Sequence, residues 1–148
     1  SLQALRELYP RGEKNITDII NNFSISHSKQ IFPNQNEIGN CFNFDSVEKI
    51  ILALEKLNSS WSSETLKKLQ HASPTSLKVT FQQLQLAKEK TCDEVIEMDF
   101  KIASCMLQNH DFFEGIRAVV IDKDKNPKWK PVLLQDISEK MVQKYFTV

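Results

Sequence analysis

The feature that most constrains the fold of this chain is a recurrent helix-start signal, an acceptor side chain followed three residues later by glutamate. The first residue can cap free N–H groups of a helix, while the glutamate reaches back to the first turn. The repetition of this signal predicts an all-α segment of about six to eight helices. The pairs are Asp45 with Glu48, Thr91 with Glu94, Asp111 with Glu114, and Asp136 with Glu139.

Two serines predict further helix starts. Ser62 is expected to cap one helix, with Trp61 before the cap and Leu66 after it packed together as a hydrophobic staple. Ser73 is expected to cap the next helix, because Pro74 at the first helical position loses no hydrogen bond there.

Apolar spacing predicts which sides of three helices are buried. Residues 95–107 are apolar almost all round, which predicts a helix buried on most sides. A last helix over residues 138–146 places Ile137, Met141 and Tyr145 in one row. Residues 45–57 carry apolar side chains along one face, namely Val47, Ile50, Ile51, Leu54 and Leu57.

The N-terminal part opens directly into an apolar-periodic stretch. Short helices are predicted at residues 2–8 and 16–23, followed by a polar loop from Ser24 to Asn36. Because the chain starts inside such a pattern, we expect it to be the C-terminal portion of something longer.

Residues 110–129 form the most specific segment. Pro127 disfavours a helical residue before it, so the predicted helix stops in the polar residues that precede this proline. Trp129 is then expected to dock against the rest of the chain. The helix itself should have one apolar side, formed by Ile116, Val119 and Val120.

Charge and hydropathy exclude two classes of partner. The 148 residues hold 19 basic and 19 acidic side chains that are interspersed, which predicts no DNA-binding face. No apolar run approaches the roughly 20 residues that cross a bilayer, so no membrane partner is expected. Three widely spaced cysteines in apolar surroundings predict buried thiols, namely Cys41, Cys92 and Cys105.

No metal site or catalytic residue is predicted in this segment. Residues 122–126 imitate the start of a calcium-binding loop, but Pro127 and Leu133 occupy positions that require a sharp turn and a bidentate glutamate. The histidines lack a convincing catalytic partner, and capping or surface roles are predicted for His27, His71 and His110.

The sequence of residues 111–131 resembles the C-terminal signature of the crotonase (enoyl-CoA hydratase/isomerase) superfamily. In that signature an Asp-x-x-Glu-Gly-x-x-Ala helix is followed by a basic stretch and an aromatic residue. The individual residues are similar to those of the 3-hydroxyisobutyryl-CoA hydrolase branch rather than to those of the hydratases. The Lys-Arg-rich run of the hydratases is offset from the lysines of this chain by a residue or two. Residues 73–80 and 41–51 agree, so the resemblance extends from about residue 36 to residue 146.

The resemblance implies an α/β crotonase (ClpP/crotonase-like) fold whose sheet-bearing N-terminal half is absent from this chain. Residues 1–44 would link from that missing core, and residues 45–148 would form the C-terminal helical region. The parent would hydrolyse an acyl-CoA thioester, 3-hydroxyisobutyryl-CoA, in valine degradation, in the mitochondrial matrix or alternatively in peroxisomes. The segment alone should be inactive, because the oxyanion-hole glycines and the carboxylates belong to the missing half.

The resemblance also implies where CoA binds. Crotonases bring the C-terminal helix and the basic residues after it close to the CoA nucleotide, sometimes that of a neighbouring subunit. Lys123 and Arg117 are therefore the candidate substrate-binding residues. The alternatives are a solvated Lys123, and an Arg117 that pairs with a carboxylate or packs its stem.

The resemblance implies no separate cofactor, since CoA is part of the substrate. The implied partners are the acyl-CoA substrate and the missing core, with a second copy in a homo-oligomer as an open alternative. Two other functional classes also stay open. One is a non-catalytic crotonase-like structural protein, such as a mitochondrial ribosomal subunit, and the other is a free-standing helical interaction domain.

Overall fold

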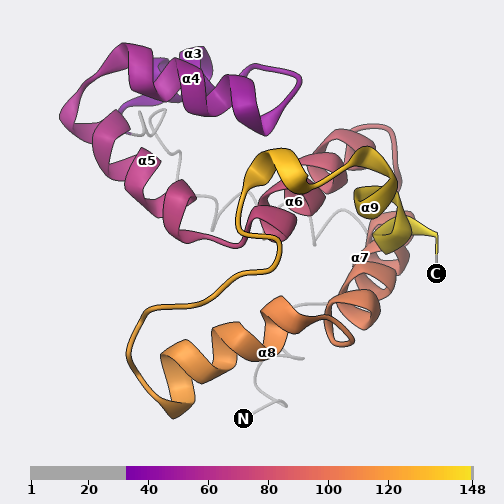
Figure 1. Cartoon of the computed structure of the whole chain (residues 1–148). Helices are drawn as coiled ribbons and strands as arrows, with labels where there is room; N and C mark the ends of the chain where they lie inside the picture. The colour runs from indigo at the N-terminus through magenta and orange to yellow at the C-terminus, as the bar shows by residue number, and fades with distance from the viewer. Residues whose placement is uncertain (1–32, 148) are drawn as a thin grey trace, which may run out of the picture. The chain divides into compact units, whose positions relative to one another are not determined.

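The computed structural model describes residues 33–147, and its compact unit spans Asn36–Val148 (Figure 1). The described residues form seven α-helices and no strand, which confirms the all-α prediction for this part of the chain. The short helices predicted at residues 2–8 and 16–23 lie outside the described residues.

The helices follow one another through short connections. A π-helix, η1 (Arg117–Ile121), continues the sixth α-helix directly, and two 3₁₀ turns, η2 (Leu134–Asp136) and η3 (Lys144–Phe146), flank the last one. The α-helices are α3 (Gln35–Phe42), α4 (Val47–Leu57), α5 (Ser60–His71), α6 (Pro74–Ala87), α7 (Cys92–Met106), α8 (His110–Ile116) and α9 (Glu139–Gln143).

Helix α3 was not predicted. It begins at Gln35, so the predicted polar loop, which extended to Asn36, is wrong at its end. The pair of Asn34 and Glu37 has the same spacing as the other predicted helix starts, but this pair was missed. Cys41 near the end of α3 is buried, with 2% of the residue exposed, and packs in one cluster with Ile50 and Leu54 of α4.

Two predicted caps are confirmed. Thr91 and Glu94 form a reciprocal capping box at the start of α7, with each side chain bonded to the other residue's N–H. Ser73 accepts a hydrogen bond from the N–H of Ser76, and Pro74 is the first residue of α6. Both motifs close over one helical turn and need nothing from the rest of the chain.

Three other starts were predicted at the wrong residue. Helix α4 is capped by Ser46, whereas Asp45 forms an ion pair with Lys49 at 2.7 Å. Helix α5 is capped by Ser59, so Ser62 is its third residue and the staple of Trp61 with Leu66 is wrong. Helix α9 is capped by Ser138, and Asp136 lies in η2 instead. In each case a serine near the predicted position supplies the cap.

Two clusters of buried side chains share α6. One cluster joins α6 and α7 to the C-terminal segment and contains Val79, Met98, Ile102, Ile137, Val142 and Tyr145. The other is formed by Cys41, Ile50 and Leu54, with Phe81 of α6 packed against it. Helix α6 thus connects the α4–α5 side of the unit to the α7–α9 side.

The predicted apolar faces are confirmed in part. Val47, Ile50 and Leu54 of α4 are buried, as their spacing predicted, although Leu57 is exposed. Helix α7 departs from its prediction, because among the described residues only Met98 and Ile102 of this helix are buried. Ile96 and Phe100 have 61% and 73% of their surface exposed. Helix α7 therefore carries apolar side chains on more sides than the described residues cover.

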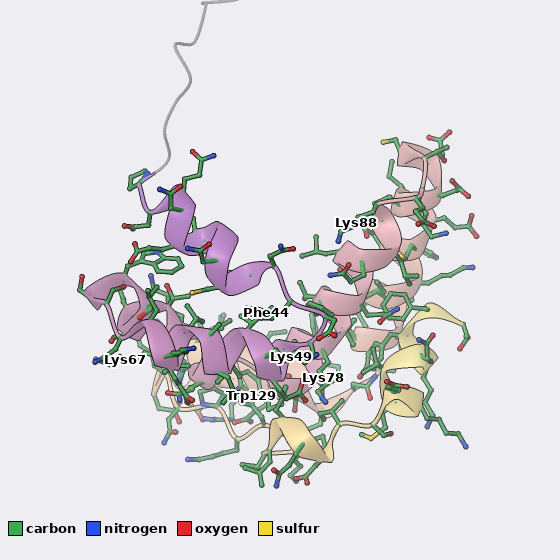
Figure 2. All side chains as sticks on the ribbon, turned by 90° about the horizontal axis from the view of Figure 1, so that it is seen from above. Phe44, Lys49, Lys67, Lys78, Lys88 and Trp129 are labelled. Carbon is green, nitrogen blue, oxygen red and sulfur yellow. The ribbon has the colours of Figure 1, made fainter. Side chains whose placement is uncertain are left out.

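Lys78 on α6, labelled in Figure 2, connects three elements through its ammonium group. Its Nζ lies 2.7 Å from Glu48 Oε1 of α4 and donates to the carbonyl of Ile137 at 3.0 Å. Its side chain is 20% exposed, so these charge-assisted bonds are shielded from water more than a surface pair would be.

Replacing Lys78 with alanine should lower the free energy of unfolding by about 1–3 kcal/mol, because two hydrogen bonds to a charged group are lost. Urea denaturation measures this change. Lys68→Ala is the matched control, since Lys68 pairs with Glu64 at 3.1 Å with both side chains largely exposed. The control should cost about 0–0.5 kcal/mol. Equal losses in the two variants would contradict the bridging role of Lys78.

Candidate functional site

The candidate site is the continuous segment formed by α8, η1 and residues 122–130. Asn109 is the residue before α8, and its side chain makes no capping bond. The predicted capping box of Asp111 with Glu114 is therefore wrong. Both carboxylates instead accept hydrogen bonds from other parts of the chain. Asp111 accepts from Ser73 and Lys130, and Glu114 accepts from Arg117 and Lys128.

Asp111 is buried at the start of α8 and accepts hydrogen bonds from two distant groups. The Ser73 hydroxyl donates to its Oδ2 at 2.6 Å, and the Lys130 N–H donates to its Oδ1 at 2.8 Å. His110 Nδ1 also lies 3.1 Å from Oδ1. One carboxylate thus holds together the start of α6, the start of α8 and the segment that follows residue 126.

The contact of serine, aspartate and histidine is not a hydrolase triad. In a triad the imidazole lies between the other two groups and takes the proton of the serine hydroxyl. Here Asp111 lies between Ser73 and His110, and the Ser73 oxygen also caps α6. The arrangement supports a structural role for Ser73 and Asp111, with His110 in contact with Asp111 from a partly exposed position.

Arg117 is the second centre of this segment. Its guanidinium makes five hydrogen bonds, which matches the five N–H groups that an arginine can offer. It grips Glu114 with two parallel bonds, from Nε at 2.9 Å and from Nη2 at 2.8 Å. Nη1 bonds to Asp122 at 2.6 Å and to Asp124 at 2.8 Å, and Nη2 reaches the Asn126 carbonyl at 3.2 Å. The carboxylate-pairing alternative for Arg117 is therefore present in the structure.

These bonds shift the pKa values of the groups involved. The bidentate bond from Arg117, together with the Lys128 N–H, lowers the pKa of Glu114 to about 2. The bond from Arg117 also lowers the pKa of Asp124, and the three carboxylates raise the pKa of Arg117. Glu114, Asp124 and Arg117 are consequently ionised at neutral pH.

The residues after η1 form a tight turn held by backbone bonds. The Asp122 N–H donates to the Arg117 carbonyl at 2.8 Å, which is the π-helical pattern, and the Lys125 N–H donates to the Ala118 carbonyl at 3.0 Å. Lys123 and Lys125 adopt positive φ values of 56° and 53°. The Asp122 and Asp124 carboxylates, which imitated a calcium loop in the sequence, face Arg117.

Trp129, labelled in Figure 2, docks as predicted. Its Nε1 donates to the carbonyl of His71, the last residue of α5, at 2.9 Å. Its ring lies over Gly115 of α8, where an added Cβ would stand 3.5 Å away. The tryptophan therefore fixes the returning segment against both α5 and α8.

The apolar side predicted for this helix exists but is uncovered among the described residues. Val119 and Val120 have 63% and 61% of their surface exposed, and Ile116 has 36% exposed. Phe113 and Ile121 are also exposed, whereas Ala118 is fully buried. We call the exposed set Phe113, Ile116, Val119, Val120 and Ile121 the apolar stripe.

The two candidate CoA-binding residues lie six positions apart in this same segment. Arg117 bonds with its carboxylate partners, and Lys123 is exposed in the turn that those partners form. The CoA contact itself stays a prediction. Sequence reasoning missed the roles of Glu114, Asp122 and Asp124, although the spacing of Glu114 and Arg117, three residues apart, is a known signal for an ion pair on a helix.

Other predicted features lie apart from this segment. Cys41 is buried, and burial raises the pKa of its thiol, but Cys92 is exposed, so the prediction of buried thiols is wrong there. Within residues 33–147 no cluster of three His, Cys, Asp or Glu side chains is placed to hold a metal ion. No helix in the same range has the length and apolar character needed to span a membrane.

Comparison with known proteins gives one consistent result. The family described as Enoyl-CoA hydratase/isomerase matches residues 1–146. The mitochondrial 3-hydroxyisobutyryl-CoA hydrolase of Homo sapiens is 37% identical over 91% of this chain and 36% of that protein. The same enzyme of Mus musculus is 43% identical over 74% of this chain and 29% of that protein. That of Dictyostelium discoideum is 39% identical over 98% of this chain and 40% of that protein.

Solved structures agree on the fold. A carnitinyl-CoA dehydratase from Mycobacterium thermoresistibile gives a TM-score of 0.71 at 31% identity, over 78% of this chain and 33% of that one. An enoyl-CoA hydratase from Rhodobacter sphaeroides gives 0.74 at 24% identity, over 93% of this chain and 43% of that one. The chain therefore spans less than half of each of these relatives and solved structures.

Replacing Asp111 with asparagine should lower the free energy of unfolding by about 2–3 kcal/mol, because an amide cannot accept from both the Ser73 hydroxyl and the Lys130 N–H as a buried carboxylate does. Thermal and urea denaturation measure the change. Asp99→Asn is the control, since Asp99 accepts one bond from Gln83 on the exposed surface. A loss in Asp111→Asn no larger than in the control would contradict the role given to Asp111.

The contribution of Glu114 to the stability of the fold should depend on pH in the acid range. Because its folded pKa of about 2 lies below the ordinary glutamate value, its contribution is complete above the unfolded pKa. The contribution is lost as the pH falls from roughly 4.5, the unfolded value, towards 2. Melting temperatures of the wild type and Glu114→Gln should therefore differ most above this range and converge towards pH 2. A difference that is independent of pH would contradict this assignment.

Proposed function

We propose that this chain, which belongs to the enoyl-CoA hydratase/isomerase family, is the C-terminal helical part of a mitochondrial 3-hydroxyisobutyryl-CoA hydrolase. The parent would cleave the thioester of 3-hydroxyisobutyryl-CoA in valine degradation. The location follows the names of the three relatives described above, each of which is a mitochondrial enzyme. The same relatives do not favour the alternative of a recruited structural protein.

The apolar stripe is the structural observation that carries this proposal. Single exposed apolar side chains are common on protein surfaces. A set of them along one helix marks a surface that another element covers. Here the set is also rigidly presented, since Asp111, Arg117 and Trp129 fix both ends of the helix that bears it. We propose that the missing N-terminal core of the parent covers the stripe.

The contribution of this segment to the reaction would be indirect. No catalytic residue is assigned to it, and the groups that polarise and attack the thioester would come from the part of the parent outside this chain. The segment would close one side of the acyl-CoA site, with Lys123 and Arg117 near the CoA nucleotide. The second exposed apolar face, around Ile96 and Phe100 of α7, would serve contacts between subunits of a homo-oligomer.

The intact parent should hydrolyse 3-hydroxyisobutyryl-CoA, and purified residues 1–148 should release no CoA under the same conditions. A thiol-reactive dye that detects free CoA measures both. A matched control is the intact parent with crotonyl-CoA, which tests for hydratase activity through the loss of its conjugated double bond. Turnover by residues 1–148 alone, or hydration without hydrolysis by the parent, would contradict the proposal.

A further inference from the structure

Helix α7 buries one of its sides and leaves the opposite side open. Its buried residues Met98 and Ile102 belong to the cluster that joins α7 to α6 and to the C-terminal segment. On the other side, Ile96, Phe100 and Leu107 have 61%, 73% and 52% of their surface exposed. The helix therefore presents an apolar surface that residues 33–147 leave largely uncovered.

The exposed apolar side chains of α7 lie in a narrow line along the helix. Four exposed residues follow one another at intervals of four, three and four positions, namely Ile96, Phe100, Ala103 and Leu107. Such positions fall within about 60° of one another around an α-helix, which turns by about 100° per residue. Leu107 is the C-cap and keeps helical backbone angles, so it continues the same line. We call these four residues the α7 seam.

The width of the α7 seam favours a single helix as its partner. Alternating intervals of four and three residues are typical of the seam along which two helices pair, whereas a helix that packs on a broad core carries a further apolar row. Polar side chains border the seam on both edges, with Asp93, Glu97 and Ser104 on one edge and Asp99 on the other. These polar residues can stay in water while the seam is buried.

The α7 seam is complementary to a reversed copy of itself. Intervals of four, three and four read the same in both directions, so an antiparallel copy places Ile96 opposite Leu107 and Phe100 opposite Ala103. The largest side chain of the seam then meets the smallest one, which fills the space between two helices well. A parallel copy would place ring against ring and methyl against methyl. The seam is therefore suited to a two-fold contact, in which both partners use the same surface.

The charges of α7 favour the same antiparallel orientation. Lys101 is the single basic residue of this helix, and residues 102–109 carry no charge. The acidic residues all lie in the first half of the helix, namely Asp93, Glu94, Glu97 and Asp99. A parallel pair would bring the two acidic halves together, where like charges repel. An antiparallel pair puts each acidic half beside an uncharged half and also opposes the two helix dipoles.

We propose that the α7 seam is a two-fold interface, at which a second copy of this chain packs its own α7 in the antiparallel direction. This inference rests on the proposed function, because it specifies how the subunits of the proposed homo-oligomer meet. The seam extends over only about three helical turns. A helix pair of this length buries less than the roughly 1,600 Å² of a standard interface, so we expect a dimer that dissociates on dilution.

Analytical ultracentrifugation of the intact parent tests the interface. The wild type should sediment as a mixture of monomer and dimer whose proportions change with concentration. Phe100→Asp puts a charge at the centre of the seam and should weaken dimerisation by about thirtyfold or more. Phe100→Ala, which adds no charge, should weaken it in the same direction. Leu52→Asp is the matched control and should leave dimerisation unchanged, since Leu52 is 62% exposed on α4, outside the seam.

Two charge variants test the antiparallel orientation. Ile96→Lys and Leu107→Glu should each weaken dimerisation, because each places an unpaired charge against an apolar side chain of the second copy. The double variant should dimerise more tightly than either single variant, because each introduced lysine then faces an introduced glutamate. In a parallel dimer like charges would face each other, and the double variant would be the weakest of the three.

Three results would overturn the inference. A wild type that stays monomeric at every concentration would show that another part of the parent covers the seam, and Phe100→Asp should then lower the free energy of unfolding of that monomer. An oligomer whose mass Phe100→Asp leaves unchanged would show that the subunits meet elsewhere. A double variant weaker than both single variants would exclude the antiparallel orientation. Failure of the proposed function is a separate outcome, namely no hydrolysis of 3-hydroxyisobutyryl-CoA by the wild type, and the mass measurements do not depend on it.

Discussion

The buried carboxylate of Asp111 is the interaction on which the arrangement of this unit depends most. It accepts bonds from the cap of α6 and from the segment after the turn, while its own residue lies at the start of α8. Helix α6 in turn shares both clusters of buried side chains. A change at this carboxylate therefore affects the helices that pack on α6 and the segment after the turn that carries Trp129. Arg117 extends the same principle into the turn, where one cation holds three carboxylates that would otherwise repel one another.

Sequence reasoning succeeded where the structure is decided within one helical turn. The box of Thr91 with Glu94 and the cap at Ser73 followed by Pro74 need only nearby backbone groups, and both were predicted correctly. The pair of Asp111 and Glu114 has the same spacing but a different outcome, because Ser73, Lys130 and Arg117 bind these carboxylates instead. Spacing shows what a side chain can reach locally, and it does not show which distant donor will compete for it.

The burial of helices shows the same limit. The apolar side formed by Ile116, Val119 and Val120 and the apolar residues of α7 were both predicted from the sequence. The described residues nevertheless leave Val119, Val120 and Phe100 mostly exposed. A periodic pattern predicts that a face is suited to burial without saying which chain segment buries it. For the candidate site, the resemblance identified Arg117 and Lys123 as a pair of interest. The connection between them through Asp122 and Asp124 required coordinates, because the left-handed lysines that make the turn possible have no sequence signal of their own.

The π-helix between Arg117 and Ile121 has a consequence for comparing this protein with its relatives. Its hydrogen bonds close over five residues, whereas an α-helix closes over four, so one additional residue is accommodated in the same length of helix. In a relative whose helix stays α-helical here, residues beyond this point would occupy the same place in space while standing one position earlier in the chain. Residues after this helix should therefore be matched with those of such a relative by their location in space, because a count along the aligned letters would pair the wrong ones.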